Sequence, residues 1–200
     1  MANTGLATFG RPADEAYFSV ALASSNPTIP TTSDATLTGY ETVRVSESGI
    51  TPAVDLGKED PAKDWGGSDV LSAPSNPSAT LAVPIIDNSV AAKKLKYGAS
   101  KVDSNGNAVF DGTTDAWVVI VDELHNDEDG EPANLVRTVY PNCVPQELEL
   151  GTHVRGELII DTVTFQCLKD ATIGGYFKEL APVAVTDTTD TTDTTDTTEG

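Results

Sequence analysis

The sequence is short of basic residues, and this shortage excludes two classes of protein. Its 200 residues include 12 Lys and Arg against 31 Asp and Glu, which gives a formal net charge of −19. Proteins that hold nucleic acid or anionic membranes do so with cationic side chains that meet phosphate groups. We therefore exclude a general nucleic-acid-binding protein and a membrane-surface protein.

Long apolar runs and cysteines are also scarce. The longest strongly apolar run, Ala116–Val121, has six residues, whereas a membrane-spanning helix needs about 20. Residues 1–25 contain charged side chains and no continuous apolar segment, so we expect no secretion signal. Without such a signal, Cys143 and Cys167 are expected to be reduced thiols, and two thiols fall short of a structural zinc site.

No catalytic or metal-binding pattern emerges from the remaining residues. The two histidines, His125 and His153, lie outside the sequence contexts of metalloproteases and hydrolases. Asp103–Asn107 begins like a calcium loop, but residue 108 is Ala where that loop needs Gly, and residue 114 is Thr where it needs Glu. We predict a plain turn there, no metal, no cofactor and no enzymatic activity.

Short segments rich in β-branched and alternating residues recur along the chain, as is typical of an all-β domain. We therefore predict a mainly β fold, a β-sandwich or barrel with extended loops and arms. The predicted strands cover residues 17–23, 41–46, 50–56, 78–86, 116–124, 134–140, 144–150 and 155–168.

Turn residues between these strands predict two hairpins. Residues 41–46 and 50–56 are separated by Glu47–Gly49, which is typical of a tight connection. Residues 116–124 and 134–140 flank a polar, acidic stretch, which we expect to be the tip of a second hairpin.

One short α-helix is predicted at about residues 88–97. Asp87, Asn88 or Ser89 can accept hydrogen bonds from the first backbone N–H groups of this helix. Gly98 can adopt the left-handed conformation that ends a helix.

The acidic residues are not confined to the C-terminus. After Val185 the sequence repeats Thr-Thr-Asp with no apolar side chain, and such a segment cannot offset the entropy cost of ordering. We expect residues 186–200 to be disordered. The rest of the chain still carries 26 acids against 12 bases. We divide the chain into an N-terminal arm (1–16), a β domain (17–181) and an acidic tail (182–200).

Several segments in a fixed order carry a family resemblance. They are GYETVRVSESGITP, then KDWGGSDV with Trp65, Gly67 and Val70, then SATLAVPIIDNSVAAKKLKYG, and finally AWVVIVDE, VRTVYPN and ELIIDTVTFQCL. Over about residues 10–180, their order and spacing resemble the major tail tube protein of long, non-contractile-tailed (siphovirus-type) bacteriophages.

This resemblance implies a structural virion protein whose hexameric rings stack into the phage tail tube. One β-sheet of each subunit closes into a barrel around the lumen, and loops and arms reach the next ring. The implied partners are further copies of the chain, the tape-measure protein, and the tail tip (baseplate) and tail terminator proteins. Genomic DNA passes through the lumen during ejection without specific binding. The implied location is the virion, after assembly in the host cytoplasm.

An acidic lumen would repel DNA and keep it sliding. The candidate lumen-facing acids are Glu147, Glu149, Glu157 and Asp161, with outward solvent as the alternative. The polar loop 57–67 is a candidate contact between subunits or rings, because an aromatic in such a loop often anchors an interface. Packing of that aromatic under its own sheet is the alternative. The contact candidates are Trp65, Lys58, Asp60 and Asp64.

An alternative function is a non-catalytic β-sandwich module for binding or adhesion, on a virion or a cell surface. An aromatic platform would favour it, but the two Trp residues are far apart in the sequence and the five Tyr do not cluster.

Overall fold

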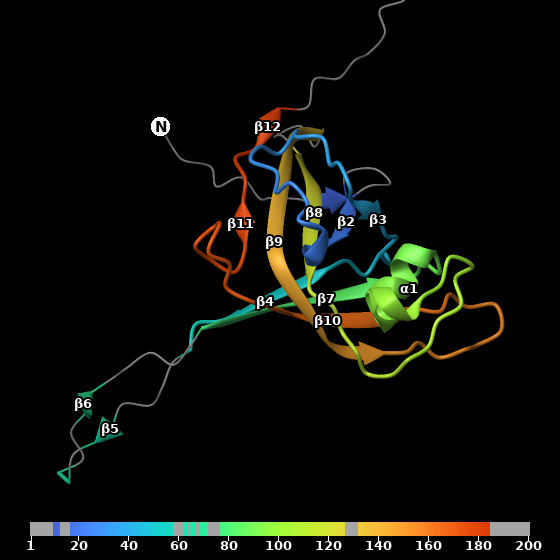
Figure 1. Cartoon of the computed structure of the whole chain (residues 1–200). Coiled ribbons are helices and arrows are strands. Elements are labelled where there is room, and N and C mark those ends of the chain that lie inside the picture. Colours follow the sequence, from blue (N-terminus) through green and yellow to red (C-terminus); the bar gives the residue numbers. More distant parts are fainter. Residues whose placement is uncertain are drawn as a thin grey trace, which may run out of the picture.

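The computed structural model describes residues 10–12, 17–57, 62–63, 65–66, 69–71, 77–126 and 132–184 (Figure 1). It contains a 10-stranded antiparallel sheet and a separate two-stranded pair, β5–β6. The described residues include one α-helix, α1, which confirms the predicted mainly β fold. The elements are β1 (Gly10–Pro12), β2 (Phe18–Leu22), η2 (Ala23–Ser25), β3 (Glu41–Thr42), β4 (Thr51–Asp55), β5 (Ala62–Lys63), β6 (Asp69–Leu71), β7 (Ser78–Ile85), α1 (Val90–Tyr97), η3 (Ala99–Lys101), β8 (Trp117–Asn126), β9 (Pro132–Glu149), β10 (Asp161–Cys167), β11 (Lys178–Glu179) and β12 (Val183–Ala184).

The large sheet folds into two layers because β9 belongs to both. Its 18 residues pair with β8 up to Cys143 and with β10 from there to Glu149. Register shifts in both ladders fall near this change of partner, and such bulges let a strand turn a corner between two sheets. Figure 1 shows β9 bending from the β2–β8 layer into the β4–β7–β10 layer. The sheet stays open within the described residues, so it is a folded sheet rather than a closed barrel.

We call the two parts the first layer and the second layer. The first layer consists of β3, β2, β8 and the start of β9, with β1 beside β8 and with β11 and β12 beside β9. The second layer consists of residues 143–149 of β9 followed by β10, β7 and β4. The main core lies between them, and the side chains that form it include Phe18, Val20, Leu81, Val83, Val119, Val163 and Phe165.

The outer face of the first layer is covered by the chain itself. Val118 and Ile120 on β8 are buried there and pack with Ile29, Leu37 and other residues of the segment 26–40. This segment was predicted to be a loop, and it has no helix or strand. Its apolar side chains cover this face of the sheet.

A buried ion pair holds this covering segment in place. The Arg137 guanidinium donates to both carboxylate oxygens of Asp122 at 2.6 and 2.7 Å, and to the Ala35 carbonyl at 2.6 Å. Ser33 accepts a hydrogen bond from the Arg137 backbone N–H and donates to the carbonyl of Ala181. The network therefore joins two strands, the covering segment and the C-terminal part of the described chain.

Helix α1 follows β7 and closes one end of the core. The Ser89 hydroxyl accepts a hydrogen bond from the Ala92 N–H at 3.2 Å, and the Gly98 N–H donates to the carbonyl of Lys94. These contacts confirm the predicted helix and its capping residue Ser89. The helix ends at Gly98 as predicted, but Gly98 has φ 94° and ψ 140° instead of the left-handed helical conformation. Leu95 is buried against the core, and Lys96 is buried on the same helix.

The predicted hairpin of residues 41–46 with 50–56 is wrong. Instead, β3 pairs with β2 in the first layer, and β4 pairs with β7 in the second. Val43 and Val45 between them are buried in the main core. With these two valines buried between the layers, the chain crosses from the first layer to the second at this point. A local hairpin would keep both strands in one layer.

Two predicted strands near the C-terminus also have different limits. Residues 144–150 are mainly the end of β9 rather than a separate strand, and β10 begins only at Asp161 instead of residue 155. Residues 150–160 form a loop instead, closed by a hydrogen bond from the Gly151 N–H to the Asp161 carboxylate at 2.9 Å. A side chain on Gly151 would collide with the backbone of Ile160, so this closure needs a glycine.

Candidate assembly interface

The outer face of the second layer carries small and polar side chains. Side chains alternate along a strand, so the residues between the buried positions of β7 and β10 point outward. The register places Glu147 opposite Thr164 and Glu149 opposite Thr162. This outer face is half-buried or exposed throughout. Its members are Ser78, Thr80, Ala82, Pro84, Glu147, Glu149, Thr162, Thr164 and Gln166.

Both lateral strands of the second layer present one open side. In the described part of the chain, no strand pairs with the outer side of β4, nor with residues 144–149 of β9 away from β10. All five residues of β4 are exposed. Unpaired strand edges of this kind are templates for pairing with another chain.

A proline fixes which backbone groups β4 offers at its edge. Pro52 has no N–H, and proline is tolerated in a strand where that position faces away from the ladder. Backbone groups alternate in direction along an antiparallel strand. The N–H and carbonyl of Val54 therefore face outward together with the carbonyl of Pro52, whereas Ala53 faces β7.

An apolar groove lies beside the β4 edge, between the two layers. Its volume is about 290 Å³, and the residues that line it include Pro52, Val54, Leu81, Tyr140 and Phe177. Val54 is 51% exposed and Phe177 is 39% exposed. Exposed apolar side chains grouped beside an open strand are typical of a protein interface.

The four predicted lumen-facing acids do not share one face. Glu147 and Glu149 lie exposed on the outer face of the second layer, and their position in a lumen stays a prediction. Glu157 is exposed in the loop 150–160. Asp161 is in register with the buried side of β10 and forms an ion pair with Lys96 of α1 at 2.8 Å. Lys96 compensates the charge of Asp161, which leaves Glu147 and Glu149 as the candidate acids on this outer face.

Of the four predicted contact residues, Trp65 lies in the described part of the chain. Its side chain is fully exposed, at 105% of the reference area, so it does not pack under its own sheet. Its role in a contact stays a prediction. Lys58, Asp60 and Asp64 lie outside the described residues.

The Lys96–Asp161 ion pair makes part of the stability dependent on pH. Burial alone would raise the pKa of Asp161, but hydrogen bonds from Lys96 and from the Gly151 N–H outweigh it and lower that pKa. A lowered folded-state pKa stabilises the protein above the unfolded pKa, and this contribution is lost as the pH falls through the folded value.

We therefore expect the free energy of unfolding to decrease below pH about 4, and Asp161→Asn to flatten that decrease. At neutral pH the variant leaves Lys96 without its partner, and we expect a loss toward the lower end of the about 3–5 kcal/mol known for buried pairs. Urea unfolding at several pH values measures both effects, with the exposed Glu157→Gln as the control. An unchanged pH dependence in Asp161→Asn would contradict this role.

The two cysteines lie side by side across β9 and β10. The Cys143 and Cys167 sulfur atoms are 3.6 Å apart, and both residues are buried free thiols. Burial, together with the neighbouring Cys167, raises the pKa of the Cys143 thiol well above its usual range. Cys143 is therefore a packed core residue and a poor nucleophile.

Among the residues that the structure describes, no three His, Cys, Asp or Glu side chains gather closely enough to hold a metal ion. The same part of the chain contains no helix with the length and apolar character needed to cross a membrane.

Comparison with known proteins identifies no family for this chain. No family model matches the chain, and no curated protein matches it. Among solved structures, it is similar to a chain of the six-fold symmetrised baseplate of the anti-feeding prophage, with 12% sequence identity and a TM-score of 0.36. The similarity covers 88% of this chain and 97% of that chain. A likeness this distant assigns no function to this chain.

Proposed function

We propose that this chain is a non-catalytic structural subunit of a siphovirus-type phage tail tube. Six copies form a ring, and the rings stack into a hollow tube in the virion. The observation that carries the proposal is the second layer, whose outer face is polar and whose two lateral strands each present an open side. A sheet with these properties can join the same sheet of a neighbouring copy at both sides.

Joining the layers removes exposed edges and produces a wide channel. In each contact, β4 of one copy pairs with residues 144–149 of β9 in the next, and the ring closes when the last copy meets the first. Six four-stranded layers give a barrel of about 24 strands, more than the 16–18 strands of porins, which already enclose water. With strands about 4.8 Å apart and tilted by about 40°, the backbone diameter is about 50 Å.

The outer face of the second layer lines this channel in the proposed tube. Its threonines are uncharged, and Glu147 and Glu149 repeat in every copy, which gives a negative lining. A negative lining repels phosphates, so the tape-measure protein and then genomic DNA can pass without being retained. Self-assembly takes place in the host cytoplasm, and the tail tip and tail terminator proteins bound the tube at its two ends.

The charge of the lining gives a test of which face meets the lumen. We expect tubes of Glu147→Lys to retain short DNA duplexes, in a manner that weakens steeply with salt, because each ring gains six cations in its channel. Wild-type tubes should retain none. Retention is measured by co-sedimentation of labelled duplexes with tubes at several salt concentrations.

Asp34→Lys is the matched control for this experiment. It changes the net charge by the same amount, but Asp34 is exposed on the segment that covers the first layer, on the other side of the fold. Equal DNA retention by both variants would show that Glu147 does not face the lumen.

A further inference from the structure

The two cysteines form a contact that the proposed function does not use. Cys143 on β9 and Cys167 on β10 stand directly opposite each other in the ladder between these strands, and their sulfur atoms are 3.6 Å apart. Both side chains are fully buried in the main core. The chain has two cysteines, 24 residues apart in the sequence, and the fold brings both to one point.

Strand pairing places the backbones of the two cysteines at a distance that suits a disulfide bond. The Leu168 N–H donates to the Asn142 carbonyl at 2.8 Å, and this hydrogen bond flanks the cysteine pair. In an antiparallel ladder, such a flanking bond marks a non-hydrogen-bonded pair, whose Cα atoms lie about 4.5 Å apart. Disulfides span Cα distances of about 4.4–6.8 Å. Rotation of the two side chains therefore suffices to bring the sulfur atoms to the bonding distance of about 2.05 Å.

The two thiols are not equivalent, because one donates a hydrogen bond to the other. The Cys143 S–H donates to the Cys167 sulfur. This hydrogen bond outweighs burial and lowers the pKa of the Cys167 thiol, whereas burial raises the pKa of the Cys143 thiol. The thiolate is the reactive form of a cysteine. Cys167 is therefore the thiol that reacts first, and Cys143 keeps its proton until a second step.

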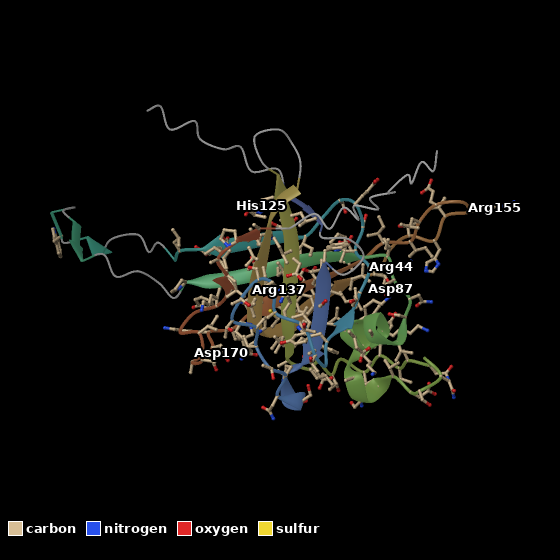
Figure 2. The ribbon with its side chains drawn as sticks, turned by 90° about the horizontal axis from the view of Figure 1, so that it is seen from above. Arg44, Asp87, His125, Arg137, Arg155 and Asp170 are labelled. Atoms are coloured by element: carbon tan, nitrogen blue, oxygen red, sulfur yellow. The ribbon has the colours of Figure 1, made fainter. Side chains whose placement is uncertain are left out.

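The pair lies where the two layers join and close to the end of a strand. At Cys143, β9 is in register with Trp117 of β8 on one side and with Cys167 of β10 on the other. β10 ends at Cys167, and the next residue, Leu168, is 42% exposed. Figure 2 shows Asp170, shortly after β10, at the edge of the folded body. Strand ends open more readily than strand centres, so a small oxidant can reach the thiols through local opening.

We propose that Cys143 and Cys167 form a reversible disulfide bond when the protein meets hydrogen peroxide. The Cys167 thiolate attacks one oxygen of the peroxide, the O–O bond breaks, and hydroxide leaves, which produces a sulfenic acid on Cys167. The Cys143 thiol then gives up its proton and its sulfur attacks the Cys167 sulfur. The S–O bond breaks, the S–S bond forms, and water leaves. Together the steps oxidise two thiols to one disulfide and reduce one peroxide to two waters.

This bond would fix β9 to β10 at the corner between the layers. It closes a loop between residues that are 24 positions apart and so restricts the unfolded chain. We expect the melting temperature to rise by about 10 °C. In the host cytoplasm the thiols stay reduced, and the bond forms after release into an oxidising medium. This timing rests on the proposed function, whereas the bond itself can be tested on the purified chain in any state of assembly.

Peptide mapping after peroxide treatment tests the proposal. The folded full-length chain is incubated with hydrogen peroxide, the remaining thiols are alkylated, and the chain is digested with trypsin without reduction. Cleavage after Arg137, Arg155 and Lys169 places the two cysteines in separate peptides. We expect mass spectrometry to find these peptides linked, and a reductant to separate them. The same reductant should reverse the rise in melting temperature.

Cys143→Ala and Cys167→Ala are the matched controls, because each keeps one thiol, and neither should show the thermal shift. Two results on the wild type alone would overturn the proposal. One is alkylated cysteines after a treatment that fully oxidises free glutathione, and the other is peptides that gain oxygen atoms without becoming linked. Linked peptides without a higher melting temperature would overturn the stabilising role of the bond. Failure of the untreated wild type to form rings would instead count against the tube proposal alone.

Discussion

Val54→Pro is expected to yield a folded monomer that no longer forms rings. The Val54 N–H faces away from β7, as deduced from Pro52 two residues earlier, so its removal costs no hydrogen bond inside the subunit. The same N–H is a donor that β4 offers to a neighbouring copy, and a second proline leaves this edge almost without donors. We expect complete loss of rings at concentrations where the wild type assembles, as measured by sedimentation velocity.

Ala53→Pro is the matched control, because it differs by one residue and faces β7. A proline at residue 53 removes a backbone N–H that faces β7. We therefore expect this variant to have a lower free energy of unfolding than the wild type. The pair of variants thus separates assembly from folding. Normal rings from a folded Val54→Pro protein would show that β4 is not the lateral contact.

Asp122→Ala is expected to have the largest effect on stability. It leaves the Arg137 guanidinium buried without a counter-charge, and breaking such a pair costs about 3–5 kcal/mol. In a chain of this size, that loss lowers the melting temperature by about 10 °C. Because Arg137 also holds Ala35, we further expect faster amide exchange in the covering segment 26–40.

Glu123→Ala is the control for that measurement, since Glu123 is the next residue on β8 but is exposed and contacts His125 at 3.5 Å. An exposed contact of this kind contributes about 0–1 kcal/mol. Equal melting temperatures for the two variants would contradict the role of the buried ion pair.

Local patterns predicted the elements whose partners lie nearby in the sequence. The helix at 90–97 follows from its capping residues, and the β8–β9 hairpin follows from two apolar runs on either side of a polar tip. The pairing of β4 with β7 was missed, because the turn at Glu47–Gly49 has the composition of a hairpin. Burial of Val43 between the layers is a tertiary effect, and periodicity alone does not reveal it.

The candidate site was predicted only in part for a similar reason. Alternation around Leu148 places Glu147 and Glu149 on one face, and the structure has them there. The same alternation does not show that Asp161 meets Lys96, which is 65 residues away in the sequence. Pro52 was the one sequence signal that marks β4 as an edge strand, since proline is confined to such positions.

Negative-stain electron microscopy of the purified full-length chain at high concentration tests the central claim most directly. We predict six-fold rings or hollow tubes, because in the proposed assembly the open edges of the second layer pair with neighbouring copies. A field of dispersed monomers would contradict the tube proposal and favour a β-sandwich binding module.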